Sequence, residues 1–164
     1  MANNDQLKSK LLRWTFALAV VQMVVGCVWC FLAPVKGEPS LIKSYAAFRG
    51  THHQYTHQAE WTAAVAFIFP YLELSPGLLW LTFVLLQVGT WTNPIAYSIM
   101  ALTGIGHDMV AGAFPDLGRS EPVSSVVEGT LKLCAVTFLA SCVLILIGVS
   151  RYRFRAPASA DKTK

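Results

Sequence analysis

The sequence predicts an all-α integral membrane protein, a four-helix bundle in which both termini are cytoplasmic. Composition supports this class, because apolar residues make up 54% of the 164 residues and charged residues only 13%, against roughly 25% charged in soluble domains. Four apolar stretches also approach the ~20 residues that a helix needs to cross a bilayer. They cover about residues 11–33, 50–69, 78–102 and 126–149. We therefore expect residues 1–164 to form one four-span transmembrane domain with a polar tail, 151–164.

The first stretch, 11–33, is apolar except for Arg13 near its start and Gln22 inside it. A secretory signal peptide is the alternative interpretation. Its apolar core would hold only ~7–15 residues, so we expect this stretch to be a retained span. Cys27 and Cys30 lie within it, and buried free cysteines usually pack as small hydrophobic residues.

The second stretch carries polar side chains where a membrane span should have none. Residues 49–61 read RGTHHQYTHQAEW and continue without a linker into an apolar run that ends at Phe69. Ionisable groups inside a span are costly, so they usually face a bundle interior and mark a site. Glu60, in an apolar setting, could stay protonated at pH 7 and serve as a neutral acid. A histidine near a helix end could instead lie at the level of the lipid headgroups.

The third and fourth stretches add polar groups at a similar depth. With a rise of ~1.5 Å per residue, His52 would lie ~27 Å from Pro70 and Tyr97 ~30 Å from Gly77, so both lie towards the outer end. Asn93 is one turn deeper than Tyr97 on the same face. The fourth stretch begins at that end with an acid and a lysine one turn apart. Polar groups from three helices thus converge on one layer that opens towards the outer leaflet.

Several of these residues also have a purely structural interpretation. Asn93 could satisfy the carbonyl that Pro94 leaves without a helical donor. Tyr97 could belong to an interfacial aromatic belt. Glu128 and Lys132 could form a structural ion pair.

The basic residues predict the orientation. Eight of the thirteen Lys and Arg residues lie before or at the start of the first stretch, or after the last one. The positive-inside bias places such ends in the cytoplasm. The net charge of +4 suits anionic lipid better than nucleic acid. We therefore expect a multi-pass protein with no nucleic-acid partner; the plasma membrane and the endoplasmic reticulum both fit.

The polar layer predicts a cofactor site and an acid. A histidine in an apolar bundle is a natural axial ligand for haem iron, and His52, His53 and His57 are the candidates. A ferric haem with one vacant face is a Lewis acid, whereas a neutral carboxylic acid or a tyrosine hydroxyl is a proton donor. Either would promote heterolysis of a C–O or N–O bond in a hydrophobic substrate that arrives from lipid. Without water or a reductant, the outcome would be a rearrangement.

The layout and residues 49–103 resemble the small four-span membrane isomerases that comprise styrene oxide isomerase and hydroxylaminobenzene mutase. The likeness to styrene oxide isomerase lies in His52, in Ala64-Val-Ala-Phe-Ile-Phe-Pro70 and in Trp91-x-Asn93-x-x-x-Tyr97. The likeness to the mutases lies in Leu74-Ser-Pro76, Gly89-Thr-Trp91-x-Asn93 and Glu128-Gly129.

The resemblance implies a b-type haem held by His52, a substrate-orienting amide at Gln58 and a tyrosine, Tyr97, that bonds the substrate oxygen. It also implies a homotrimer with haem near the subunit contacts. Two positions depart from it. Gln58-Ala59 stands where the family has asparagine followed by glycine, and Gln54 stands where the mutases have glutamate. The first departure reshapes the pocket.

We therefore predict an intramembrane isomerase that converts a hydrophobic aryl epoxide to a carbonyl compound by a redox-neutral, acid-promoted rearrangement. Ferric haem or a neutral acid would polarise the epoxide oxygen, and the expected catalytic residues are Tyr97, Asn93, Gln58 and Glu60. The first alternative is the mutase reaction, in which an aryl hydroxylamine becomes an aminophenol. The second is a non-catalytic haem or lipid-binding membrane protein. An electron-carrying cytochrome is disfavoured, because such bundles commonly clamp haem between facing helices and the candidate ligands here share one helix.

Overall fold

A computed structural model describes residues 2–33 and 41–152 of the chain. This part is all-helical, with four long helices and three short 3₁₀ turns. They are α1 (Ala2–Trp29), η1 (Cys30–Leu32), α2 (Tyr45–Ala66), η2 (Phe69–Tyr71), α3 (Pro76–Thr103), η3 (Asp108–Val110) and α4 (Glu121–Ser150). Each predicted apolar stretch overlaps one long helix. The polar tail predicted from residue 151 lies, from residue 153 on, outside the described residues.

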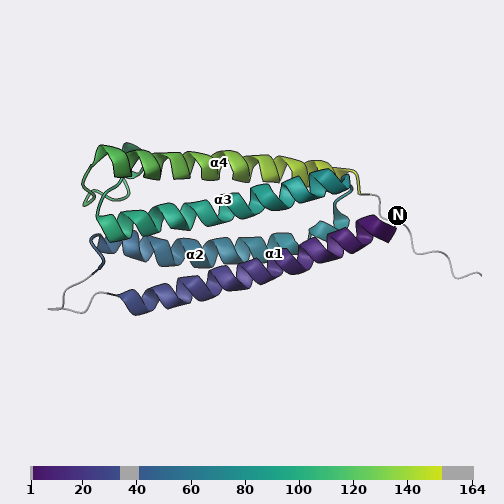
Figure 1. Cartoon of the computed structure of the whole chain (residues 1–164), viewed down its shortest axis with the longest axis horizontal. Helices are drawn as coiled ribbons and strands as arrows, with labels where there is room; N and C mark the ends of the chain where they lie inside the picture. The colour runs from purple at the N-terminus through teal and green to yellow at the C-terminus, as the bar shows by residue number, and fades with distance from the viewer. Residues whose placement is uncertain (1, 34–40, 153–164) are drawn as a thin grey trace, which may run out of the picture.

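The four long helices lie side by side in the order α1, α2, α3, α4 and alternate in direction (Figure 1). The N-terminal end of α1 and the C-terminal end of α4 are therefore at the same end of the molecule. The most extensive contacts join consecutive helices, and α1 also touches α3. α1 and α4 make no comparable contact within the described residues. The helices thus form a layer that is open between its first and last members.

Three of the long helices, α1, α3 and α4, contain segments long and apolar enough to cross a bilayer. α2 does not reach that composition, because its first half holds the polar segment that begins at Arg49. α2 nevertheless runs beside α1 on one side and α3 on the other.

Local sequence signals fix where α2 begins and where α3 begins and ends. Ser44 precedes α2, and its hydroxyl accepts a hydrogen bond from the Ala47 backbone N–H at 3.2 Å. Ser75 does the same before α3, as expected of N-cap serines. Pro76 occupies the first helical position, where its missing N–H costs nothing. α3 ends at Gly104, whose φ of 69° is the left-handed conformation that glycine adopts without strain.

Two glycines let neighbouring helices approach closely. A Cβ on Gly26 of α1 would lie 2.9 Å from the Tyr55 Cβ of α2, and one on Gly89 of α3 would lie 3.0 Å from the Phe138 backbone of α4. Small residues commonly permit such contacts between membrane helices. The approach at Gly26 matters for the site, because it brings the α1 backbone against the polar half of α2.

The apolar core has two parts with a polar layer between them. One part surrounds the α2–α3 turn and includes Phe69, Leu72 and Leu86. The other lies at the opposite end and includes Phe48, Met100 and Phe114. The buried polar residues Gln22 and Thr90 fall between the two parts along α1 and α3.

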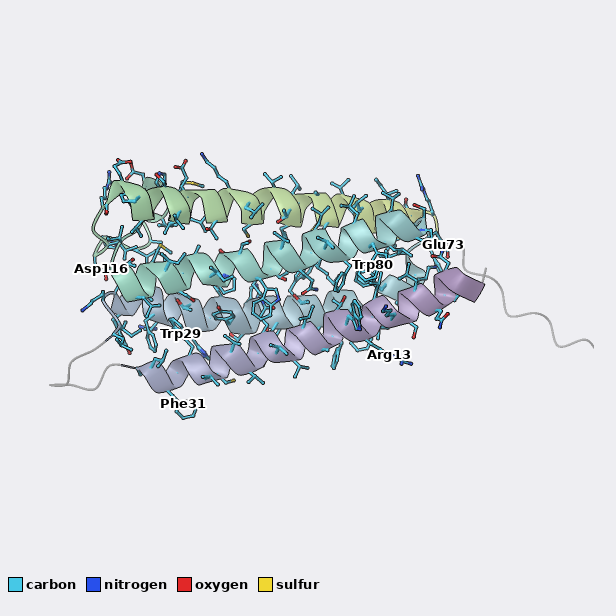
Figure 2. The ribbon with its side chains drawn as sticks, viewed as in Figure 1. Arg13, Trp29, Phe31, Glu73, Trp80 and Asp116 are labelled. Carbon is cyan, nitrogen blue, oxygen red and sulfur yellow. The ribbon has the colours of Figure 1, made fainter. Side chains whose placement is uncertain are left out.

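Polar contacts tie each end of the molecule together. At one end Lys8 of α1 forms an ion pair with Glu73 in the α2–α3 turn at 3.2 Å. At the other end, the Ser44 hydroxyl donates to the Asp116 carboxylate at 2.8 Å, which fixes the α3–α4 connection beside the start of α2. Figure 2 shows Glu73 and Asp116 at opposite ends, with Trp29 of α1 and Phe31 of η1 near the Asp116 end.

Candidate functional site

A cavity lies at the Asp116 end, between η1, the first half of α2 and the α3–α4 connection. Its volume is about 650 Å³. Its described lining residues are Cys30, Ala46, Phe48, Arg49, Gly50, His52, His53, Ala113 and Phe114. Two of the three predicted histidine ligands thus face one space. A second cavity of about 190 Å³ lies within the α3–α4 connection and is lined in part by His107 and Arg119.

His52 is held by α1 in a defined orientation. Its Nδ1 lies 2.8 Å from the backbone carbonyl oxygen of Gly26. A carbonyl oxygen only accepts hydrogen bonds, so Nδ1 carries a proton, and of the two neutral tautomers only the one with an unprotonated Nε2 fits this contact. The Cys30 sulfur lies 3.2 Å from the same Nδ1. Metal-bound histidines usually donate their other N–H in this way, which fixes the ring and raises the basicity of the ligand nitrogen.

The other two histidines lie on the exposed face of α2. The rings of His53 and His57 are stacked with centroids 5.8 Å apart, and both side chains are exposed. Neither ring bonds to another helix within the described part of the chain. His53 lines the larger cavity, whereas His57 does not. Of the three candidates, His52 is therefore the one whose ring is positioned by a neighbouring helix.

Asn93 bonds to α2 rather than to the backbone that Pro94 disturbs. Its Nδ2 donates to Gln54 Oε1 at 2.7 Å. Pro94 has no N–H, so the Thr90 carbonyl lacks its helical donor. The Nε2 of Gln22, which is fully buried on α1, donates to that carbonyl at 2.8 Å. The structural role considered for Asn93 thus belongs to Gln22.

Tyr97 lies directly behind the cavity wall. Its ring packs against Gly50, where a Cβ would come within 2.8 Å of the tyrosine Cδ1. It also meets Phe114 edge to face, with centroids 5.4 Å apart. Gly50 and Phe114 both line the cavity. Within the described residues the Tyr97 hydroxyl makes no hydrogen bond, so it is available to a ligand.

Gln58 has a buried amide oxygen, Oε1, with no hydrogen-bond partner among the described residues. A buried acceptor left unpaired costs about 1–3 kcal/mol. Such a group is expected to meet a water molecule or a ligand donor. This supports a binding role for Gln58, although it does not line the larger cavity.

Glu60 lies on the exposed face of α2 and lines neither cavity. The structure therefore does not bring this carboxyl together with His52 and Tyr97 within one chain. Its neighbour Trp61 is 41% exposed, and its ring meets Phe138 of α4 at 5.8 Å.

The polar residues at the start of α4 form an ion-pair cluster rather than part of the larger cavity. Lys132 pairs with Glu128 one turn earlier, which was the structural interpretation of these two residues. His107 Nε2 lies 3.3 Å from the second carboxylate oxygen of Glu128. The cluster therefore fastens the α3–α4 connection onto α4.

The donor set around His52 suits a haem better than a bare metal ion. No group of three or more His, Cys, Asp and Glu side chains is placed to hold a metal ion within residues 2–33 and 41–152. A haem brings its own four nitrogen ligands, so a single axial histidine is sufficient. An Nδ1-protonated histidine on a cavity whose walls include Phe48 and Phe114 meets that requirement.

The contribution of α1 was missed at the sequence level. Gln22 had a usable signal, because it is the one amide inside the first apolar stretch and Pro94 requires an outside donor for a carbonyl. Cys30 was interpreted as a packing residue, yet it lines the cavity beside His52. The Gly26 carbonyl is a backbone group and leaves no sequence signal.

Comparison with known proteins gave one family. The family model described as styrene oxide isomerase matches residues 7–150 of the chain, which includes most of α1 and all of α2, α3 and α4. Neither the curated proteins nor the solved structures compared with the chain gave a match.

Proposed function

Because the chain belongs to the styrene oxide isomerase family, we propose that it is a membrane isomerase that rearranges a hydrophobic aryl epoxide to a carbonyl compound. One observation carries the proposal within the site. His52, in a chain of this family, lines a cavity with aromatic walls, and because its Nδ1 proton is committed to the Gly26 carbonyl, Nε2 is the nitrogen left for a ligand. The reaction is redox-neutral and consumes no nicotinamide or flavin.

The proposed cofactor is a b-type haem held by His52 Nε2. A bound ferric haem would supply a Lewis acid that polarises the epoxide oxygen. The chain's own part is to fix the ligand ring through Gly26 and to enclose the substrate with Phe48 and Phe114. Enclosure excludes water, which would otherwise capture a cationic intermediate as a diol.

Tyr97 is the proposed donor to the substrate oxygen. Its hydroxyl has no partner among the described residues, and its ring lies against two cavity-lining residues. As the benzylic C–O bond breaks, the electron pair moves to oxygen, and the hydrogen bond stabilises that charge. A hydride or carbon group then migrates with its electron pair to the cationic carbon, and an oxygen lone pair closes the carbonyl. No atom is gained or lost.

The amides around Tyr97 are proposed to position it and the substrate. The bond from Asn93 to Gln54 joins α3 to α2 one turn from Tyr97 and two residues from His52. Asn93 therefore holds the two helices in register at the reacting centre. Gln58 is proposed to orient the substrate. Glu60 is exposed on a single chain, so it is proposed to act as an acid only in an oligomer in which a second subunit covers it.

The proposed assembly is a four-span homo-oligomer, a trimer in the family's manner, with both termini cytoplasmic and all four helices crossing the bilayer. The exposed face of α2 supports an oligomer, because His53, His57 and Glu60 would otherwise meet lipid. Ionisable side chains at that depth are normally covered by protein or paired.

The test is an absorption spectrum of the detergent-purified protein before and after dithionite, followed by turnover of an aryl epoxide. We expect a Soret band that shifts on reduction, and its loss in His52→Ala but not in the matched control His57→Ala. The rate of epoxide rearrangement should fall together with the Soret absorbance. Full turnover in His52→Ala would refute the haem mechanism, and no conversion of any aryl epoxide by the loaded protein would refute the function.

One observation favours a second candidate, the conversion of an aryl hydroxylamine to an aminophenol. The unpaired Gln58 Oε1 is an acceptor, and a hydroxylamine carries N–H and O–H donors whereas an epoxide carries none. Gln58→Leu should then depress hydroxylamine turnover more than epoxide turnover. Equal losses for both substrates would remove the argument for the second reaction.

A further inference from the structure

Arg49 is a cation in the larger cavity without a partner in the described structure. It lies one helical turn before His52 and lines the same space. It forms no ion pair or hydrogen bond with residues 2–33 or 41–152. Two other cations at this end are paired, Arg119 with Asp108 and Lys132 with Glu128, and Lys43 does not line this cavity.

The cavity around Arg49 contains no acid among its described lining residues. It holds one guanidinium and two imidazoles, while Phe48 and Phe114 provide aromatic surface. A cavity with one permanent positive charge and apolar walls favours an anion attached to an apolar body. Guanidinium groups bind carboxylates in a planar, two-point geometry, so a carboxylate is the matching anion.

The positions of Arg49 and His52 along α2 indicate how a ligand that contacts both residues would be oriented. Three residues of helix separate Arg49 from His52 by ~4.5 Å along the axis, and Arg49 is nearer the start of α2 at Tyr45. A flat ligand anchored at His52 and extending towards the end of the helix would therefore place its polar edge at Arg49.

We propose that Arg49 is the anion-binding residue of this cavity and that its ligand is a carboxylate carried on a flat, apolar body. Two sources share this chemistry: the propionate groups of the haem that the proposed function places at His52, and a carboxylate on an aromatic substrate. For the first source the inference rests on the proposed function. The proposal that Arg49 binds an anion can be tested by binding alone, whether or not the protein turns over an epoxide.

The experiment measures binding to the full-length protein in detergent, without catalysis. Iron-free protoporphyrin IX and its dimethyl ester are titrated by fluorescence into the wild type, Arg49→Gln, Arg49→Lys and the control Arg119→Gln. Because a hydrogen-bonded charge pair contributes ~1.5–3 kcal/mol, the free acid should bind roughly 10-fold or more weakly to Arg49→Gln. Arg49→Lys should lose less, and Arg119→Gln should match the wild type. The dimethyl ester should bind all four proteins alike.

A second arm distinguishes the sources. If Arg49→Gln leaves protoporphyrin binding unchanged but raises the KM of a carboxyphenyl epoxide relative to phenyl epoxide, the ligand is a substrate carboxylate. Equal behaviour of acid and ester in every protein, together with no selective effect on the carboxylated substrate, would overturn the proposal. Arginine-dependent porphyrin binding without epoxide turnover would instead reject the proposed function and retain the anion site.

Discussion

Replacing Gln22 with leucine should lower the free energy of unfolding, because Pro94 leaves a carbonyl of α3 that depends on Gln22 for a hydrogen bond. The Gln22 amide is fully buried and supplies the hydrogen bond, 2.8 Å long, to the Thr90 carbonyl that Pro94 leaves without a donor. Leucine has nearly the same shape but no donor, so the carbonyl would remain unpaired in the interior. An unpaired buried acceptor costs about 1–3 kcal/mol, whereas hydrogen bonds between membrane helices average ~0.6 kcal/mol and reach ~1.7. We therefore expect a contribution of about 1–2 kcal/mol from this one carbonyl.

Gln22→Leu alone does not isolate that quantity, because it also removes the unpaired Gln22 Oε1. Pro94→Ala restores an N–H to the helix and gives Thr90 its own donor. The Oε1 contribution is the same in both backgrounds and cancels in a double-mutant cycle. The free energy of unfolding is measured by SDS titration in mixed micelles for the four proteins. Gln22→Leu should cost about 1–2 kcal/mol more with Pro94 present than with alanine there. A coupling energy of zero within error would refute the reasoning.

Two further predictions concern the reacting layer. Gly50→Ala should lower kcat for the aryl epoxide at least several-fold, because its Cβ would come within 2.8 Å of the Tyr97 ring and displace it; Gly129→Ala, whose Cβ meets nothing within 4 Å, should leave kcat unchanged. Asn93→Leu and Gln54→Leu should each lower kcat, and the double variant should be no worse than the poorer single one, since they share one hydrogen bond. Additive losses in the double variant would show that the two amides act separately.

The all-helical class and the apolar, membrane-type character of three helices could be predicted, because composition and hydropathy report directly on long apolar helices. The helix ends could not, since hydropathy detects only the apolar part of a helix. α1 begins at Ala2, nine residues before the predicted span, because polar residues such as Asp5 and Gln6 also form helix. α2 begins at Tyr45 with a serine cap, a local signal that hydropathy does not detect.

The candidate site was predicted in part for a similar reason. Spacing along a helix tells which residues share a face, so the layer containing His52, Asn93 and Tyr97 could be inferred. It does not tell which neighbour covers that face. Glu60 was expected inside the layer, and the structure leaves it exposed on a single chain. The contacts of α1 with His52 and with Thr90 depend on helix packing, which no local pattern encodes.

The packing of α4 chiefly on one neighbour, α3, has a consequence for the order of assembly. α4 packs chiefly on α3, and it fastens the α3–α4 connection through the contact of Glu128 with His107. Synthesis from the N-terminus completes α1, α2 and α3, and with them the bonds to His52 and Asn93, before α4 exists. The wall formed by Ala113 and Phe114 is then the last to close. A flat ligand such as the proposed haem would therefore reach His52 before that wall is complete and would be enclosed when α4 docks.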